Sequence, residues 1–222
     1  MKKIKMTLEL LSDTLSGSGE GFGAIIDSDV QYDDCGIPYI SSKRIKGNLR
    51  NSLYDLLNMP AISRLISAKG INIKNLLDEI FGEIGSASQS TFEISNFYIE
   101  ESETVKQWVT YLKNKYSSVF SNEKILSTLT NVRRQTTIDD EGVAKKHSLR
   151  TSRVVNKNLK FVGEICYDEK INDSEKFIAL ACANLRRIGI KRNRGLGKVK
   201  CLLEGSLIDN AIEQMKNELE AK

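Results

Sequence analysis

The sequence predicts an α+β fold, a ferredoxin-like or RNA-recognition-motif-like sandwich that forms one domain over residues 1–222. Residues near both ends of the chain alternate apolar and polar side chains, as half-buried strands do. Two segments with helical periodicity follow strands, and the order of elements is strand, helix, strand, insertion, strand, helix, strand. A chain of 222 residues is also long enough to bury one core.

The N-terminal part supplies a strand, a long loop and a helix. Residues 3–11 alternate apolar and polar side chains, which indicates a half-buried strand. Residues 12–36 form a loop rich in glycine, serine and aspartate. A helix then begins near Ser41 or Ser42, because either hydroxyl can cap it. The apolar stripe of this helix is Ile45, Leu49, Leu53 and Leu56.

The middle of the chain predicts two insertions into the sandwich, at 58–90 and 103–158. Residues 61–82 in the first insertion are predicted to be helical. Residues 91–101 are rich in β-branched and aromatic side chains and are predicted to form a strand between the two insertions.

The second insertion is predicted to hold a helix and a hairpin. Residues 103–120 have apolar side chains at helical spacing. Those expected to face the core are Val105, Trp108, Val109 and Leu112. A polar, basic hairpin follows at about 131–158, with "DDEG" at 139–142 as its turn.

The C-terminal part returns to the sandwich pattern. Residues 159–167 alternate as a strand, and a helix is expected from Ser174 to Ile188. A loop with glycine and basic residues then leads into a last strand at 198–207, and a short acidic helix closes the chain.

Basic residues gather in three segments, although the net charge is only +4. Residues 43–50 and 186–200 hold four and seven Lys or Arg and no acid, and residues 131–160 hold eight against three acids. One such run is explained by a solvated surface, but three separated runs favour a nucleic-acid partner. The candidate RNA contacts are Lys43, Arg44, Lys46, Gly47, Arg50, Arg133, Arg134, His147, Arg187, Lys191, Arg192, Arg194, Gly195 and Gly197.

The most informative motif is "RIGIKRNRGLGKVK", at 187–200. Its glycines permit backbone conformations closed to other residues and let main-chain N–H groups approach phosphates. Its arginines can bind a phosphate through two parallel hydrogen bonds. The motif therefore predicts a cradle for an RNA backbone, and the alternative is a surface turn with solubilising arginines.

Two aspartates in the loop before the first helix, Asp27 and Asp29, are the candidate catalytic residues, and Asp27 is the candidate metal ligand. A carboxylate beside cationic residues can hold a divalent metal against a phosphodiester, or orient the attacking 2′-hydroxyl of RNA. Asp33 and Asp34 precede "CGIP" and fit an ordinary role in turns. Asp27 follows the apolar "AII", where a turn former is not expected.

Other kinds of site are not predicted. His147 is the only histidine, and a histidine without a partner is more often a surface contact than a general base. No GxxxxGK[ST] occurs, and the glycines at 16–23 are not followed by a helix, which argues against nucleotide fingerprints. The four cysteines form no CxxC pair and no long apolar run occurs, so we expect a cytoplasmic protein with no membrane partner.

The segments "GIPYISSKRIKGNLR" at 36–50 and "LRRIGIKRNRGLGKVK" at 185–200 resemble the RAMP superfamily of CRISPR-associated proteins. The resemblance is to the backbone subunits, of the Csm/Cmr type, of type III effector complexes. Two further segments are similar to stretches of these subunits: "GAIIDSDV" at 23–30 and "FGEIGSASQSTFEISNFYI" at 81–99. The loop with "IDSDV" favours the type III-D branch.

This resemblance implies a function. Such subunits stack along a CRISPR RNA, and a β-hairpin thumb, here about 131–158, displaces a base at regular spacing. Asp27 would cleave the paired target RNA with a divalent metal, Mg²⁺ or Mn²⁺. The partners implied are CRISPR RNA, target RNA and other type III effector subunits, including copies of this chain or related RAMP subunits. The residues that match the guide-binding helix and the glycine loop are Lys43, Lys46, Gly47, Arg50, Gly195 and Gly197.

Alternatives remain open at this point. "ISSKR" replaces the usual "IPGSS", and Asp29 stands where the family commonly has a small residue or proline, so Asp27, Asp29 or both could act. The chain could be a non-catalytic RNA-binding scaffold, or a metal-independent endoribonuclease that processes guide RNA and needs His147. Outside the family, it could bind small nucleotides with the glycine loop.

Overall fold

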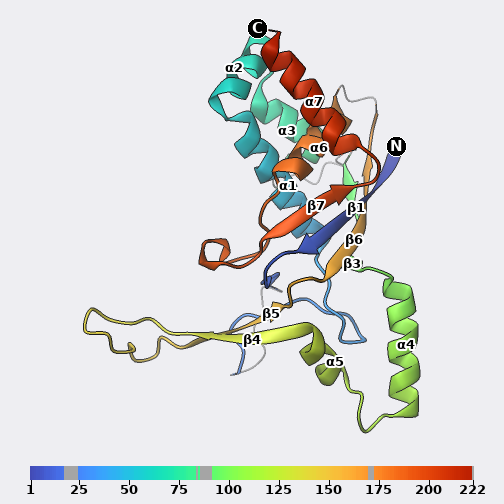
Figure 1. Ribbon diagram of the computed structural model, residues 1–222, viewed down its shortest axis with the longest axis vertical. Coiled ribbons are helices and arrows are strands. Elements are labelled where there is room, and N and C mark those ends of the chain that lie inside the picture. Colours follow the sequence, from blue (N-terminus) through green and yellow to red (C-terminus); the bar gives the residue numbers. More distant parts are fainter. Residues whose placement is uncertain (18–24, 84, 86–91, 170–172, 222) are drawn as a thin grey trace.

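The structure is a computed structural model that describes residues 1–17, 25–83, 85, 92–169 and 173–221 (Figure 1). The small-residue loop expected within 81–99 and the glycines just before Asp27 therefore lie partly outside the described residues. Figure 1 shows one antiparallel sheet with helices on one side of it, and a separate hairpin that extends away from the sheet.

The main sheet has the strand order β2–β6–β1–β7, with β3 also paired to β6. Its strands are β1 (Lys2–Leu10), β2 (Glu93–Ile94), β3 (Tyr98–Ile99), β6 (Lys160–Tyr167) and β7 (Val199–Leu203). Every pairing is antiparallel. Along the chain, helix α1 (Ser42–Leu57) follows β1, and helix α6 (Ser174–Asn184) follows β6. This order confirms the predicted ferredoxin-like α+β fold.

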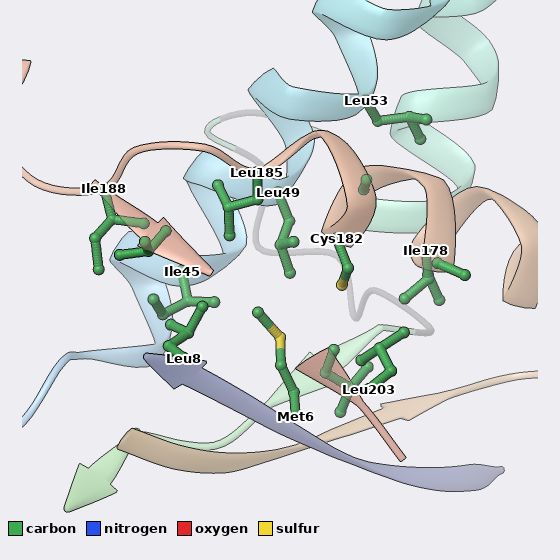
Figure 2. Packing of buried hydrophobic residues seen from close by; sticks show 14 of the residues in the cluster. Met6, Leu8, Ile45, Leu49, Leu53, Ile178, Cys182, Leu185, Ile188 and Leu203 are labelled. Atoms are coloured by element: carbon green, nitrogen blue, oxygen red, sulfur yellow. The ribbon is translucent and has the colours of Figure 1, made fainter. Parts of the chain in front are cut away.

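The core lies between this sheet and two helices, α1 (Ser42–Leu57) and α6 (Ser174–Asn184). Alternate residues of β1, among them Met6 and Leu8, point from the sheet towards both helices (Figure 2). Ile45, Leu49 and Leu53 of α1 are fully buried as predicted, whereas Leu56 is only partly buried. Burying each large apolar side chain contributes about 1.5–3 kcal/mol, so this layer fixes the position of α1.

Helix α1 begins at Ser42 as predicted, but the capping atom comes from elsewhere. The Ser42 amide donates to Asn96 Oδ1 at 2.9 Å, and the side chain of Ser41 makes no cap bond. Asn96 lies between β2 and β3, so the prediction of one strand over 91–101 is wrong. The strand is interrupted between β2 and β3 because this segment turns away from β6. It caps α1 there and pairs with the residues that precede α1.

A second group of helices packs behind α1 and α6 (Figure 1). They are α2 (Pro60–Ala68), α3 (Ile73–Phe81) and α7 (Leu207–Glu220). The single helix predicted at 61–82 is divided in two, because Gly70 has a φ of +70° and Asn72 caps a new helix at the Asn75 amide. In the described part of the chain, no helix is long and apolar enough to cross a lipid bilayer.

Helix α4 (Ser102–Lys115) corrects another expectation. None of its residues is buried, and Trp108, expected to face the core, is 61% exposed. Helix α4 stands apart from the sandwich in Figure 1. Val105, Val109 and Leu112, the other three residues expected to face the core, are half-buried, and Lys106 forms an ion pair with Asp33 of the acidic loop. The helix ends five residues before the predicted boundary.

The predicted basic hairpin is confirmed. Helix α5 (Asn122–Leu129), which the sequence did not predict, leads into β4 (Thr130–Gln135), and β4 pairs with β5 (Arg150–Val155). The turn lies where "DDEG" predicted it, because Asp139 accepts hydrogen bonds from the amides of Glu141 and Val143.

Candidate nucleic-acid interface

Part of the acidic loop lies beside strand β5. Ser28 forms an isolated parallel bridge with Ser152. The Asp27 amide donates to the Thr151 carbonyl at 2.9 Å, and the Arg153 amide donates to the Ser28 carbonyl at 3.0 Å. Main-chain bonds of the hairpin therefore hold the candidate catalytic segment.

The two candidate catalytic carboxylates lie in different environments. Asp27 is exposed, and its Oδ2 accepts a hydrogen bond from the Thr151 amide at 2.6 Å. Asp29 is only 5% exposed, and its Oδ2 lies 3.0 Å from Arg153 Nη1. The other oxygen of Asp29 accepts from the Val30 amide at 2.7 Å. Of the two carboxylates, Asp27 is the one that can meet a solvent-borne ligand.

The glycine loop between α6 and β7 reaches the same strand. Lys191 Nζ donates to Ser152 Oγ at 2.9 Å and to Gln135 Oε1 at 3.3 Å. The helix predicted to reach Ile188 ends at Asn184, because the chain turns back there and the Ile188 amide pairs with the Gly197 carbonyl. Figure 1 shows this loop and the hairpin on the same side of the molecule.

Two glycines of this loop have different steric surroundings. Gly195 and Gly197 both have a positive φ, of +77° and +75°. A Cβ at Gly197 would lie 2.0 Å from the Ile188 carbonyl oxygen, whereas a Cβ at Gly195 would meet no atom within 4 Å among the described residues. Gly197 is therefore needed for packing, and Gly195 faces open space where a phosphate can approach.

Gly197→Ala should destabilise the protein much more than Gly195→Ala. Left-handed backbone costs a non-glycine residue about 1–2 kcal/mol, and both variants bear that cost. Only Gly197→Ala adds a clash with main-chain atoms, which cannot move aside as a side chain can. Urea unfolding of the two variants would measure the difference. Equal losses of unfolding free energy would contradict this account of the loop.

The basic residues of α1 divide between two sides of the helix. Lys43 and Gly47 are exposed, and a Cβ at Gly47 would meet no described atom within 4 Å. Any close approach at Gly47 must therefore come from another molecule or from an undescribed segment. Arg44 is half-buried, with its Nη2 3.7 Å from the position that a Cβ at Gly17 would take.

Lys46 and Arg50 face the protein instead. Lys46 Nζ donates to the Phe92 carbonyl at 3.2 Å, and partial burial, followed by the charge of Arg50, lowers the pKa of Lys46 below its ordinary value. Arg50 donates to the carbonyls of Leu77 and Gly82 at 3.0 and 2.8 Å. Their predicted RNA contacts stay predictions, and the structure gives both side chains a role in joining α1 to its neighbours.

A groove of about 400 Å³ lies between α1 and the glycine loop. Arg192 Nη1 is 3.5 Å from Asn48 Oδ1 across it, and Arg187 donates to the Arg192 carbonyl. Sequence reasoning missed its carboxamides, although Asn48 and Asn51 lie one and four residues after the exposed Gly47 on α1. The polar residues that line it are Asn48, Asn51, Ser52, Asp55, Asn184, Arg186, Arg187, Arg192 and Asn193.

The remaining candidates lie on the exposed hairpin, apart from Arg194, which lies in the glycine loop. Arg133 forms an ion pair with Asp13 at 2.8 Å, which ties the base of the hairpin to the sandwich. Arg134 and Arg194 are exposed. His147 is exposed in the connection between β4 and β5 and has a φ of +59°. The structure therefore brings Asp27 and Lys191 to β5, while His147 lies further out along the hairpin.

A divalent metal at Asp27 would have few protein ligands. Within the described ranges, no group of three or more His, Cys, Asp or Glu residues could hold a metal ion. Asp27 has one carboxylate oxygen, Oδ1, that accepts no hydrogen bond from a described residue. Mg²⁺ is commonly held by one or two carboxylates together with substrate phosphates and water. The residues present therefore fit an ion shared with a phosphate ligand.

Comparison with known proteins bears on the family and on the fold. A sequence model of the RAMP superfamily matches residues 7–200. The comparison with curated proteins found no sequence match.

Two solved structures show the same fold. A chain in the cryo-EM structure of the type III-B Cmr-beta bound to cognate target RNA has 14% identity and a TM-score of 0.63, and the match covers 95% of this chain and 99% of that one. A chain in the apo state of the type III-B Cmr-beta also has 14% identity and a TM-score of 0.63, with 93% and 98% covered.

Proposed function

We propose, since the chain belongs to the RAMP superfamily, that it is a guide-RNA-binding backbone subunit of a type III CRISPR effector complex that cleaves paired target RNA. The observation that carries the proposal is the placement of Asp27. Asp27 is exposed and is anchored to β5 by a hydrogen bond. Lys191 of the glycine loop contacts the same strand. An acid that faces solvent beside a basic surface is suited to a phosphodiester substrate.

The proposed partners are CRISPR RNA, target RNA and other type III effector subunits, including copies of this chain or related RAMP subunits. One structural relative is a chain in the cryo-EM structure of the type III-B Cmr-beta bound to cognate target RNA. Similarity in fold over almost all of both chains supports a corresponding place in a complex. The type III-D subtype favoured by the acidic loop stays a prediction.

The guide RNA would be held by its backbone. Lys43, Arg192 and Arg194 are exposed cations on α1 and the glycine loop. Gly47 and Gly195 leave open space beside them. Such a surface grips ribose and phosphate without reading bases, so target choice falls to base pairing with the guide. Affinity should then be sensitive to salt, because bound counterions are released.

Asp27 would act together with a divalent metal, Mg²⁺ or Mn²⁺. When bound, such an ion neutralises charge on the scissile phosphate and lowers the pKa of a nucleophile. The chain itself would hold the ion through the exposed Asp27 carboxylate, which the hydrogen bond from the Thr151 amide fixes in place. A non-catalytic scaffold is the second candidate, and the single carboxylate exposed in this segment is the observation that favours it.

Charge reversal on the proposed RNA surface should weaken RNA binding. In Lys43→Glu/Arg194→Glu, two exposed cations become acids. Log affinity falls with log salt, and each lost contact to a single strand should make this slope shallower by about 0.7. The slope of the double variant should therefore be shallower by about 1.4. Filter binding or fluorescence anisotropy over a salt series measures this slope.

The matched control is Arg64→Glu/Lys74→Glu, which makes the same change of charge on exposed positions of α2 and α3. It should keep the native slope. Equal slopes for the two double variants would contradict the proposed surface. Purification of the native chain from its host should also yield a bound small RNA of uniform length, and its absence would argue against a guide-binding subunit.

A further inference from the structure

Three consecutive residues of β5 connect the hairpin to two functional loops. Thr151 binds Asp27 through its amide and carbonyl groups. Ser152 accepts a hydrogen bond from Lys191 of the glycine loop. Arg153 holds Asp29 by an ion pair and Ser28 by a main-chain bond. The segment that carries the proposed catalytic aspartate is thus attached to β5 both before and after Ser28.

The Asp29–Arg153 ion pair is the part of this attachment that depends on side-chain charge. The side chains of Asp29 and Arg153 are 7% and 17% exposed, so solvent screens the pair little. Asp29 also accepts the Val30 amide, which leaves neither of its oxygens without a partner. A buried charge with both oxygens occupied is poorly placed to bind a metal or a phosphate.

Asp29 lies two residues after Asp27, on a segment that is also anchored by apolar packing. Ile26 and Val30 are 3% and 1% exposed, whereas Ile25 is 72% exposed and contributes little. The main-chain bonds at Thr151 and Arg153 set the register of this segment, and the ion pair fixes it to β5 two residues after Asp27. Loss of the pair would let the Asp27 carboxylate move relative to β5.

We propose that Asp29 is a positioning residue, which acts through Arg153 to hold the Asp27 carboxylate at a fixed place on the hairpin. This inference rests on the proposed function of Asp27. It assigns the two aspartates different tasks: Asp27 meets the substrate, and Asp29 meets only the protein. It also explains why a charged residue is tolerated beside the catalytic position.

Asp29→Asn is the test variant, because the amide keeps the shape and can still accept from Val30 while the charge is lost. In the complex with guide RNA, single-turnover cleavage of target RNA should fall about 10- to 100-fold, the effect expected for a displacement near 1 Å. Target affinity should stay native. Asp33→Asn is the matched control, since Asp33 is another loop aspartate whose oxygen accepts main-chain amides.

A double-mutant cycle tests whether Asp29 acts through Arg153. Arg153→Gln alone should give a loss similar to Asp29→Asn, and the double variant should be no slower than either. Additive losses would mean that the two side chains act separately, which overturns the inference. Arg153→Gln also supplies the result if Asp29→Asn does not fold.

Hydrogen exchange supplies a readout that general destabilisation would not produce. In Asp29→Asn, the Thr151 amide, which donates to Asp27 Oδ2, should exchange faster. The Val155 amide lies on the same strand as Thr151 and donates to the Thr14 carbonyl, and it should keep its protection. A purely structural role of Asp29 would instead expose both amides together.

The outcomes separate this inference from the proposed function. Native exchange at Thr151, or a native cleavage rate in Asp29→Asn while Asp27→Ala is inactive, overturns the positioning role alone. Cleavage that survives Asp27→Ala overturns the proposed function, and exchange at Thr151 still decides whether Asp29 anchors the segment.

Discussion

Asp27→Ala should abolish cleavage of target RNA, with a fall of about three orders of magnitude, while guide binding is retained. The carboxylate is the chain's proposed ligand for the metal, and loss of several kcal/mol of charge stabilisation corresponds to this factor. The segment itself should stay in place, because the Asp27 amide and the Ser28 carbonyl keep their bonds to β5. No cation of the RNA surface is removed, so guide affinity should not fall.

The measurement is cleavage of a labelled target by the assembled complex, with and without EDTA. Asp34→Ala is the control, since it removes an exposed aspartate from the same loop and changes the net charge equally. A rate within about threefold of the native rate would exclude Asp27 as the acting residue. Cleavage that survives EDTA and disappears in His147→Ala would instead identify the metal-independent enzyme.

The fold could be predicted because its signals are local. The alternation of β1 and the spacing of Ile45, Leu49 and Leu53 on α1 are each set by one element, and their order leaves few topologies. Helix α4 has the same kind of spacing, but none of its residues is fully buried and Trp108 is exposed. Periodicity shows that a face is apolar, and it cannot show how deeply that face is buried.

The site could be predicted only in part because its discriminating contacts are distant in sequence. Asp27 and Asp29 look alike in the sequence, and Arg153, 124 residues beyond Asp29, decides which of them is buried. The same limit applies to α1. Helical spacing predicts that Lys43, Lys46 and Arg50 share one face of α1. Packing of α3 separates Arg50 from the exposed Lys43, and no local sequence pattern predicts that packing.

Arg50→Ala should therefore affect stability before it affects RNA binding. Arg50 Nη2 lies 2.5 Å from Asp78 Oδ1, and the side chains are 15% and 24% exposed. Removing one partner of such a pair should cost about 3 kcal/mol, the low end for a buried pair, because some exposure remains. For a chain of this size the midpoint of thermal unfolding should fall by about 6–12 °C.

Lys43→Ala is the matched comparison, seven residues earlier on the same helix and exposed. It should leave the unfolding midpoint almost unchanged and lower RNA affinity, because its amino group has solvent and not protein around it. Arg50→Ala should show the reverse, with native RNA affinity at temperatures where the variant is folded. If Arg50→Ala instead lost RNA affinity at a native midpoint, its contacts with Leu77, Asp78 and Gly82 could not be its main role. The RNA surface would then extend over the α3 side of the helix. The pair of variants thus decides which side of α1 faces RNA, with the same helix and the same loss of one cation in both.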